Sequence, residues 1–208
     1  DDLDETLGSV AEDGDCDGWL TADDCNDGDS SIYTGAPETL DDGIDQDCDG
    51  GDDVTCVGDY EVTADSASQI AALEYCAVIT GSLFTSSNTN LDGLSSLITV
   101  GDYLYIFSNP ALTNVDGLSS LTTVGGDLYI ESNSVLANVD GLSSLIDVGG
   151  YLNISYNDAL TNVDGLSSLT TVGDWLSIED NSSLTNVDGL SSLTDVEGYL
   201  IISYNAAL

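Results

Sequence analysis

The sequence predicts a mainly β protein: a parallel β-solenoid with 24-residue turns, one N-terminal cap helix and a small loop-rich module before it. Three observations support this prediction. The segment LTNVDGLSSL, which begins at Leu112, occurs three times unchanged and once as LANVDGLSSL. An Asp-Gly pair accompanies the repeats at a constant spacing of 24 residues. The acidic residues gather ahead of the repeats, because residues 1–55 contain 20 of the 39.

These patterns divide the 208 residues into three segments. We expect an acidic calcium-binding module at 1–55, a disulfide-linked N-terminal cap with the first turn at 56–90, and the repeat solenoid at 91–208, open at its C-terminal end. An open end exposes backbone groups and core leucines, so we expect either more protein after Leu208 or a second copy docked there. The chain begins with Asp1 and not with Met, which indicates a cleavage or a segment of a longer protein.

The acidic module contains two copies of the pattern DxDxDG, the first half of a calcium-binding loop. They are DGDCDG at 13–18 and DQDCDG at 45–50. Alternate Asp side chains can converge on one cation, and the Gly permits a sharp turn. The first copy predicts these ligands: Asp13, Asp15, Asp17, the backbone carbonyl of Trp19, Thr21 and Asp24. The second copy predicts Asp45, Asp47 and Asp49, with further ligands from elsewhere: Asp27, Asp29, Asp41 or Asp42.

Calcium is the ion that this composition favours. The chain has no His and no Met, so the nitrogen and thioether ligands that suit copper are missing. Calcium instead takes six to eight hard oxygen ligands, which carboxylates supply. The formal charge is −39 with no Lys or Arg, so bound cations or high salt must also relieve self-repulsion. We therefore predict Ca²⁺ as the cofactor.

The five cysteines all lie in the first 76 residues, and none is spaced as CxxC. Without His, a zinc site would need four thiolates, so disulfides in an oxidising compartment are the simpler expectation. Cys16, Cys25 and Cys48 allow three single pairings, of which we favour Cys25–Cys48. The odd number leaves one thiol free or paired between chains.

The segment after Cys56 predicts a short strand followed by a helix. Residues 60–63 alternate like a strand, and the helix is expected from about Ser66 to Tyr75. Asp65 or Ser66 would cap its N-terminus.

Each repeat contains a short strand, such as YLYIFSN at 103 or DLYIESN at 127. Alternate residues of such strands point inward, and the strands of successive turns stack into parallel sheets. The predicted inward residues are Leu104, Leu128, Leu152, Leu176 and Leu200, with Ile106, Ile130, Ile154, Ile178 and Ile202. The rest of each turn has an apolar residue at every third position, which suits a coil that turns inward at each step. In the first full repeat these residues are Leu112, Val115, Leu118, Leu121 and Val124.

Polar residues also recur once per turn. One asparagine ladder is expected to bond backbone amides of its own and the next turn: Asn88, Asn109, Asn133, Asn157, Asn181 and Asn205. A second consists of Asn114, Asn138, Asn162 and Asn186. The Asp-Gly pairs begin at Asp92, Asp116, Asp140, Asp164 and Asp188. Here we favour Asx-turns, in which each carboxylate accepts the following Leu-Ser-Ser amides, over a column of bound cations. The glycines are expected to supply backbone freedom at this corner.

The pattern L-x-I-x-x-N, with leucines round the turn, resembles leucine-rich repeats. A Cys, a cap helix and then Cys-x-x-I-x-G-x-L, here from Cys56 to Leu83, resembles the start of the receptor L domain and of bacterial secreted proteins with L-domain-like repeats. This resemblance covers residues 56–208. It implies a Cys56–Cys76 disulfide and a helix that closes the first turn of the solenoid. The first turn, Asn88 to Asn109, departs from the pattern because it has 21 residues rather than 24.

The string DCNDGDSSIYTGAPETLDDGIDQDCDG resembles a family of metal-binding motifs in secreted bacterial proteins, in which DCxDxD, PGAxE and DGxDxDCDG recur. Tyr33 to Glu38 matches the middle of that motif. The cysteine that usually follows this Glu is Leu40 here, and Cys16 is extra, so the disulfide pattern of the family does not transfer directly. Some relatives bind copper through other residues.

The composition excludes several classes of function. Nothing neutralises phosphate, so neither nucleic acid nor an anionic membrane surface is an expected partner. The sequence has no apolar run long enough for membrane insertion. Without His, Lys or Arg there is no Ser-His-Asp triad, Schiff-base lysine or phosphate clamp, and no pair among the repeated acids stands out as a glycosidase pair. We therefore expect a protein that is not an enzyme.

Two functions remain, and for both we expect an extracellular or cell-surface location. The first is a calcium-binding structural protein, a subunit or segment of a cell-surface filament or stalk that contacts other copies end to end. The alternative is a surface adhesin that recognises a glycan or protein through outward aromatic side chains. Those side chains are Tyr103, Tyr105, Tyr129, Tyr151, Trp175 and Tyr199. Their other interpretation is cross-strand pairing that stabilises the sheet.

Overall fold

A computed structural model of the chain describes residues 13–15, 18–20, 24–63 and 67–208. The chain divides into two compact units, Asp1–Val54 and Thr55–Leu208. The second unit contains both the predicted cap segment and the repeats. In the described residues no helix is long and apolar enough to cross a membrane.

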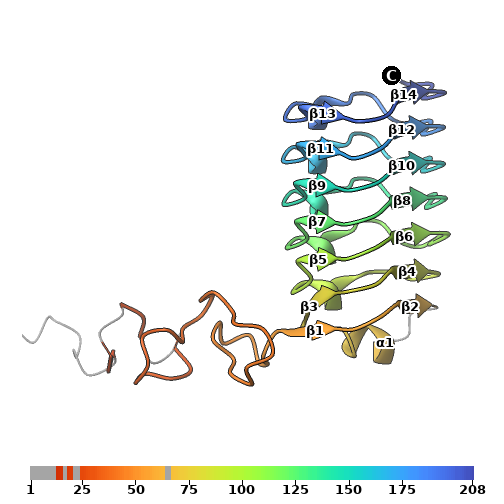
Figure 1. Ribbon diagram of the computed structural model, residues 1–208. Helices are drawn as coiled ribbons and strands as arrows, with labels where there is room; N and C mark the ends of the chain where they lie inside the picture. Colours follow the sequence, from red (N-terminus) through yellow and green to blue (C-terminus); the bar gives the residue numbers. More distant parts are fainter. Residues whose placement is uncertain (1–12, 16–17, 21–23, 64–66) are drawn as a thin grey trace, which may run out of the picture. The chain divides into compact units, whose positions relative to one another are not determined.

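The second unit is a parallel β-solenoid, as predicted, in which every turn adds one strand to each of two sheets (Figure 1). The first sheet follows the order β1 (Val54–Cys56), β3 (Cys76–Ile79), β5 (Thr99–Val100), β7 (Thr123–Val124), β9 (Asp147–Val148), β11 (Thr171–Val172) and β13 (Asp195–Val196). The second sheet follows the order β2 (Tyr60–Thr63), β4 (Leu83–Ser86), β6 (Leu104–Phe107), β8 (Leu128–Glu131), β10 (Leu152–Ser155), β12 (Leu176–Glu179) and β14 (Leu200–Ser203).

The register places equivalent residues of successive turns side by side. Leu128 pairs with Leu152, and Ile130 pairs with Ile154. The predicted inward Leu and Ile residues are fully buried from β6 to β12, whereas in β14 Leu200 is 54% and Ile202 36% exposed. The core is therefore a column of aliphatic side chains between the two sheets, and each turn buries the one before it.

The apolar residues at every third position lie in and around short 3₁₀ helices. Leu112, Val115, Leu118, Leu121 and Val124 are all fully buried. A 3₁₀ helix has three residues per turn, so a period of three keeps one face toward the core. The five helices are η1 (Asp92–Leu94), η2 (Asp116–Leu118), η3 (Asp140–Leu142), η4 (Asp164–Leu166) and η5 (Asp188–Leu190).

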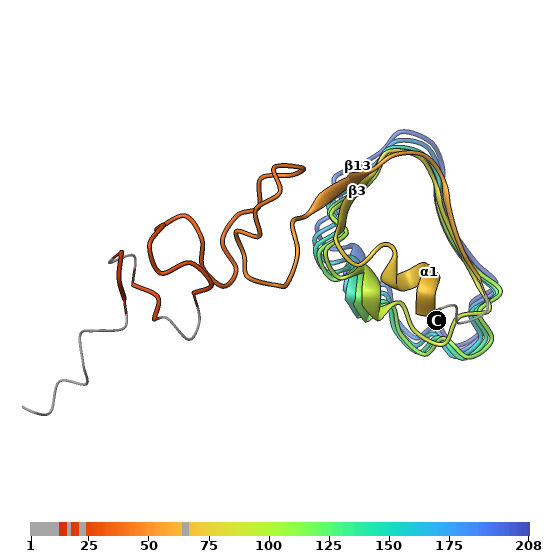
Figure 2. The same cartoon turned by 90° about the horizontal axis from the view of Figure 1, so that it is seen from below.

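The cap helix α1 (Ala67–Ala71) is shorter than the predicted helix from Ser66 to Tyr75. It lies at the β1–β2 end of the stack (Figure 1) and over the interior of the turns when the solenoid is viewed along its length (Figure 2). The chain tightens after Ala71, because the Leu73 N–H donates to Ile70 O and the Cys76 N–H to Leu73 O. These tight turns bring buried Leu73 and Cys76 into the core at the start of β3. The predicted capping residues, Asp65 and Ser66, lie outside the described residues.

The first asparagine ladder has the structural role that the sequence predicts. Asn133 Oδ1 accepts the backbone N–H of Asn109 at 3.0 Å, and Asn133 Nδ2 donates to Ile106 O at 2.9 Å. The same contacts recur one turn later, where Asn157 Oδ1 accepts the Asn133 N–H and Asn157 Nδ2 donates to Ile130 O. These side chains are fully buried from Asn88 to Asn181, so they satisfy backbone groups where water cannot reach.

The prediction that the Asp of each Asp-Gly pair forms an Asx-turn is wrong. The preceding asparagine makes this turn, since Asn114 Oδ1 accepts the Asp116 N–H at 3.1 Å. Asp116 itself begins η2, and its backbone carbonyl accepts the Ser119 N–H at 3.2 Å. The Asp116 side chain is exposed. The reason is geometric: the residue that starts a 3₁₀ helix has its N–H free, and the side chain two positions earlier is placed to accept it.

The expectation about the glycine of this pair is also wrong. Among the described glycines, those with positive φ are Gly18, Gly35, Gly43, Gly50 and Gly58, none of which lies in the repeats. A Cβ on Gly141 would instead lie 2.0 Å from Val115 O of the preceding turn. Glycine is needed there because the turns approach closely.

Candidate metal site and aromatic face

The first unit is a set of loops held by a disulfide and a small core. Cys25 and Cys48 form a disulfide with a Cα–Cα distance of 5.7 Å, the pairing that we favoured. Ile32 and Ala36 are buried, and so is the Gln46 side chain. The disulfide therefore joins the start of the acidic string to its last DxDxDG copy.

The segment from Tyr33 to Glu38 pairs with the chain just before Cys48. Tyr33 N–H donates to Gln46 O and Gly35 N–H to Asp47 O, both at 2.9 Å. Gly35 has a φ of 81°, a left-handed conformation that glycine adopts without strain. These contacts carry Glu38 to the loop that contains Asp47.

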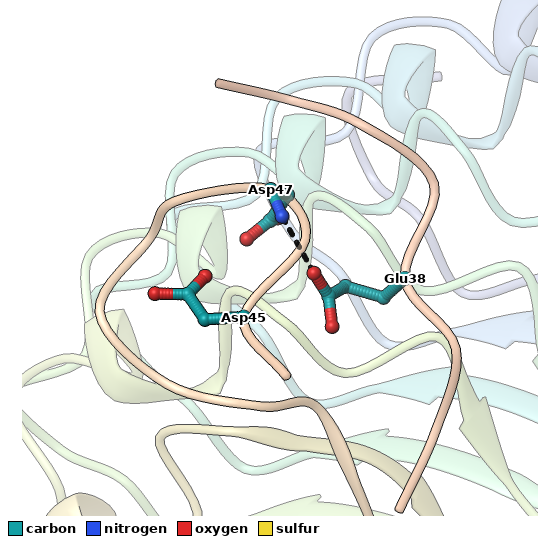
Figure 3. A group of neighbouring side chains, drawn as sticks. All are labelled: Glu38, Asp45 and Asp47. Carbon is teal, nitrogen blue, oxygen red and sulfur yellow. Dashed lines mark hydrogen bonds between the residues drawn. The ribbon is translucent and has the colours of Figure 1, made fainter. Parts of the chain in front are cut away.

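Three carboxylates meet at this point: Glu38, Asp45 and Asp47 (Figure 3). One oxygen of each lies within 4.8 Å of the other two, and in the described part of the chain this is the one group of at least three such residues. The Asp47 N–H donates to Glu38 Oε1 at 2.6 Å. Calcium–oxygen distances of about 2.4 Å let two ligand oxygens lie up to about 4.8 Å apart, so the spacing fits one hard cation.

The backbone of the loop is arranged around Asp45. Asp45 Oδ1 accepts the Asp49 N–H at 3.2 Å, and Asp45 Oδ2 accepts the Gly50 N–H at 3.1 Å. The first DxDxDG copy repeats the second of these bonds, because Asp13 Oδ2 accepts the Gly18 N–H at 3.3 Å. Both copies thus fold their glycine back onto their first aspartate.

The electrostatics of the cluster favour a cation. Burial raises the pKa of Asp47, and the neighbouring Asp49, Glu38 and Asp45 carboxylates raise this pKa further. The hydrogen bond from the Asp49 N–H lowers the pKa, but the net shift is upward. Glu38 Oε2 is buried and has no hydrogen-bond partner among the described residues. A cation would satisfy this oxygen and offset the repulsion between the three acids. The donor set is entirely carboxylate, which suits Ca²⁺, Mg²⁺ or Mn²⁺.

The structure does not bring the other predicted ligands into this cluster. Asp29 accepts hydrogen bonds from the hydroxyl and the N–H of Ser31, which lower the pKa of Asp29. Asp42 accepts from Ile44 N and from Gln46 Nε2. Asp49, Asp27 and Asp41 are described but lie outside the three-carboxylate group.

The first DxDxDG copy is described in part. Asp13, Asp15, Trp19 and Asp24 are described, while Asp17, Thr21 and Cys16 lie outside the described residues. The Trp19 ring stacks on Tyr33, with centroids 5.4 Å apart. Asp24 is 6% exposed; its Oδ1 accepts the Asn26 N–H, and its Oδ2 has no hydrogen-bond partner among the described residues.

Sequence reasoning missed Glu38 as a candidate ligand. The signal was present, because Glu38 is the last residue of the Tyr33–Glu38 match to the metal-binding family. The DxDxDG pattern predicts ligands that are close together in sequence. Glu38 is distant in sequence and lies near Asp45 and Asp47 because the two backbone segments pair.

Comparisons with known proteins agree with this location. Residues 24–53 match a family model described as "Putative metal-binding motif" and named for copper-binding MopE. The match includes all three clustered carboxylates and none of the repeats. No curated protein and no solved structure matches the chain. The family therefore supports metal binding by the first unit, and its name points to copper rather than calcium.

The six predicted aromatic residues differ in exposure and in the rings that they contact. Tyr103, Trp175 and Tyr199 are 43%, 44% and 67% exposed, whereas Tyr105, Tyr129 and Tyr151 are half-buried. Two groups result. The larger one is continuous, with Tyr105 stacked on Tyr129 (4.7 Å) and on Phe84 (4.9 Å), Tyr103 tilted against Tyr105, and Tyr151 edge-on to Tyr129. The smaller one is the Trp175–Tyr199 pair, 5.1 Å apart and edge-on.

Asp127 forms hydrogen bonds with two of these tyrosines. It occupies the position that is aromatic in most other turns, and its Oδ1 accepts the Tyr151 N–H at 2.8 Å. Its Oδ2 accepts the Tyr129 hydroxyl at 3.5 Å. Burial and the Asp127 charge raise the pKa of Tyr129 to about 12. The rings therefore do stabilise the sheet by cross-strand contacts, and the exposed ones remain accessible to a ligand.

The second disulfide lies at the start of the solenoid. Cys56 at the end of β1 is bonded to Cys76 at the start of β3, as the resemblance to the L domain implies. Cys76 is buried, as is Leu73 three residues before it. The bond closes a loop that contains the whole cap.

Proposed function

We propose that this chain is an extracellular, calcium-binding structural protein, a subunit or segment of a cell-surface filament or stalk. The observation that carries the proposal is the convergence of Glu38, Asp45 and Asp47, with a buried carboxylate oxygen that has no hydrogen-bond partner among the described residues. Calcium is preferred to copper because the donors are all oxygen, and the sequence has no His or Met.

The structural role is supported by the uniformity of the second unit. Successive turns share one register, one asparagine ladder and one 3₁₀ helix position. Such a stack is a rigid spacer, because each turn is fixed by the same contacts as its neighbours. Two disulfides favour an oxidising, extracellular location. The Cys56–Cys76 bond and the cap helix support the likeness to receptor L domains.

Calorimetric titration of the full chain tests the metal site. Wild type should bind Ca²⁺ more tightly than Mg²⁺ or Cu²⁺, and Asp45→Asn should weaken calcium binding at least about tenfold, because it removes one charged ligand. Asp29→Asn is the matched control, since Asp29 lies in the same unit but contacts Ser31. Copper binding that Asp45→Asn does not alter would contradict the proposal.

Light scattering and electron microscopy test the filament role. We expect the full chain to form ordered end-to-end filaments in millimolar calcium and to dissociate in EDTA. A monomer in both conditions would overturn the assembly role while leaving the calorimetric result intact.

A second candidate function is recognition of a glycan or protein through the aromatic side of the solenoid. The exposed, mutually packed rings favour it, because rigid aromatic side chains bind at a low cost in conformational entropy. A glycan array and a protein array would test it, with Trp175→Ala expected to weaken binding. Retention of every array signal by that variant would exclude Trp175 from the binding surface.

A further inference from the structure

The second sheet departs from its repeat at two outward positions of its strands. At the second strand position the residues are aromatic only in β4, β6 and β8: Phe84, Tyr105, Tyr129, then Asn153, Ser177 and Ile201. At the fourth position Phe107 is the one aromatic residue of the column, which otherwise consists of Thr63, Ser86, Glu131, Ser155, Glu179 and Ser203. A uniform spacer has no need of these differences, so this part of the sheet is where a specific site is expected.

A pocket of about 360 Å³ lies at this place. It is lined by Phe84, Tyr105, Phe107, Ser108, Glu131 and Ser132. Its volume falls within the range of about 300–1,000 Å³ typical of small-molecule sites. The three rings form an apolar wall, while Glu131 and the two serines provide a polar end.

The wall of the pocket is held in place before any ligand arrives. Phe84 and Tyr105 stack 4.9 Å apart with planes 7° from parallel, and Tyr129 stacks on the far side of Tyr105. Ser108 has a φ of 53°, and its N–H donates to Glu131 O at 3.0 Å. A preorganised pocket loses little conformational entropy on binding.

Glu131 differs from its equivalent two turns later. The Glu179 carboxylate accepts hydrogen bonds from the hydroxyls of Ser177 and Ser203. The Glu131 carboxylate accepts none from the described residues: Tyr129 stands where Glu179 has Ser177, and Ser155, the equivalent of Ser203, makes no hydrogen bond to it. Glu131 is therefore a charged group beside an apolar wall, and no described residue donates a hydrogen bond to its carboxylate.

We propose that this pocket binds a small organic ammonium compound with an aromatic or aliphatic body. The body would pack on Phe84, Tyr105 and Phe107, and the ammonium group would pair with Glu131. Charge complementarity selects this class, because the chain carries −39 with no cation of its own and repels anionic ligands. The proposal rests on the recognition function given above as the second candidate and does not depend on the metal site.

Three probes with the same phenylpropyl body test the charge requirement: 3-phenylpropylammonium, 3-phenylpropanol and 4-phenylbutanoate. Binding is measured by calorimetry. Millimolar calcium is kept present so that the first unit does not compete for the cation. The full chain should bind the ammonium probe at least about tenfold more tightly than the alcohol, and the anion more weakly still. Equal binding of the ammonium and the alcohol would overturn the proposal.

Three variants test the location. Glu131→Gln should weaken ammonium binding at least about tenfold, whereas Glu179→Gln, the same change in the same column, should leave it within about twofold. Phe107→Ser, which restores a residue found elsewhere in that column, should also weaken binding. Equal losses of affinity for both glutamate variants would show that the overall negative charge, and not Glu131, attracts the probe. Unchanged binding by Phe107→Ser would show that the probe binds outside the pocket. Either result would overturn the proposal.

The recognition function can survive the failure of this inference. Array binding that Trp175→Ala weakens, with no binding of the ammonium probe, would overturn the pocket proposal alone. Absence of both signals would overturn the recognition function as well.

Discussion

The side-chain oxygen of Asn133 accepts the backbone N–H of Asn109 at a distance of 3.0 Å, one full turn earlier in the solenoid. Asn133 Nδ2 donates to Ile106 O at 2.9 Å and to Asn157 Oδ1 of the following turn at 3.2 Å. Each turn is thus tied to both neighbours by one buried amide. This is the polar counterpart of the aliphatic column, and it fixes the rotation of one turn over the next.

Asn133→Leu should destabilise the solenoid strongly. The substitution leaves the buried Asn109 N–H and Ile106 carbonyl without their partner, at about 1–3 kcal/mol each. We expect the free energy of unfolding, measured by urea denaturation in calcium, to fall by about 3 kcal/mol or more. Asn138→Leu is the control, because Asn138 is half-buried and, among the described residues, its Oδ1 accepts only the Asp140 N–H. Equal effects of the two changes would contradict the role assigned to the ladder.

Gly141→Ala distinguishes close packing from helix propensity. Alanine normally stabilises a helical position by about 0.5–1 kcal/mol relative to glycine. Here the added Cβ would lie 2.0 Å from Val115 O, so the turns must separate. We expect the unfolding midpoint in urea to fall by an amount equivalent to about 2 kcal/mol or more. Ser134→Ala, an exposed site in the same repeat, should change it little. An increase in stability for Gly141→Ala would refute the packing argument.

Tyr129 should make the solenoid sensitive to alkali. Desolvation, with the Asp127 charge, raises the pKa of Tyr129 from the ordinary tyrosine value of 10.0 to about 12. The folded chain therefore keeps the phenolic proton between about pH 10 and 12, where the unfolded chain loses it. The contribution of Tyr129 to stability is complete below about pH 10 and is lost as the pH rises to about 12. Urea unfolding at several pH values should show this loss, and Tyr129→Phe should reduce it.

The same variant provides a spectroscopic check on the assignment. Tyrosine ionisation is followed by ultraviolet absorbance, and the phenol that titrates last in wild type should be missing from Tyr129→Phe. If the late phase persists in the variant, another tyrosine carries the raised pKa.

Glu38→Gln should have opposite effects on the calcium-bound and calcium-free protein. The amide keeps the bond from the Asp47 N–H but removes one charge from a cluster of three acids. Without metal, repulsion falls and the first unit should melt at a higher temperature. With calcium, the lost ligand charge should weaken binding at least about tenfold.

Trp19 reports on this unit because its ring stacks on Tyr33. Thermal melts followed by tryptophan fluorescence, in a Trp175→Phe background, should therefore resolve both effects. A lower melting temperature for Glu38→Gln in EDTA would contradict the predicted repulsion among the three acids.

The repeat pattern was sufficient to predict most of the solenoid. The 24-residue spacing, the alternating strands and the three-residue apolar period each correspond to a contact that recurs in every turn, so local sequence and packing agree. The errors lay at the 3₁₀ corner. Asp116 and Asn114 have similar side chains, and only the helix start at Asp116 decides which of them accepts the N–H. The close approach of Gly141 to Val115 likewise depends on the separation of two turns.

In the acidic unit, the sequence and the tertiary structure each determine a different part of the metal site. The sequence indicated a cation as the ligand, since residues 1–55 contain 20 acids and no basic residue. It also indicated Asp45 and Asp47 through their alternate spacing. The tertiary structure added Glu38, because two hydrogen bonds between distant backbone segments place it there. Spacing along a chain reports which side chains share a loop, whereas a site assembled from two segments exists only after the backbone between them has paired.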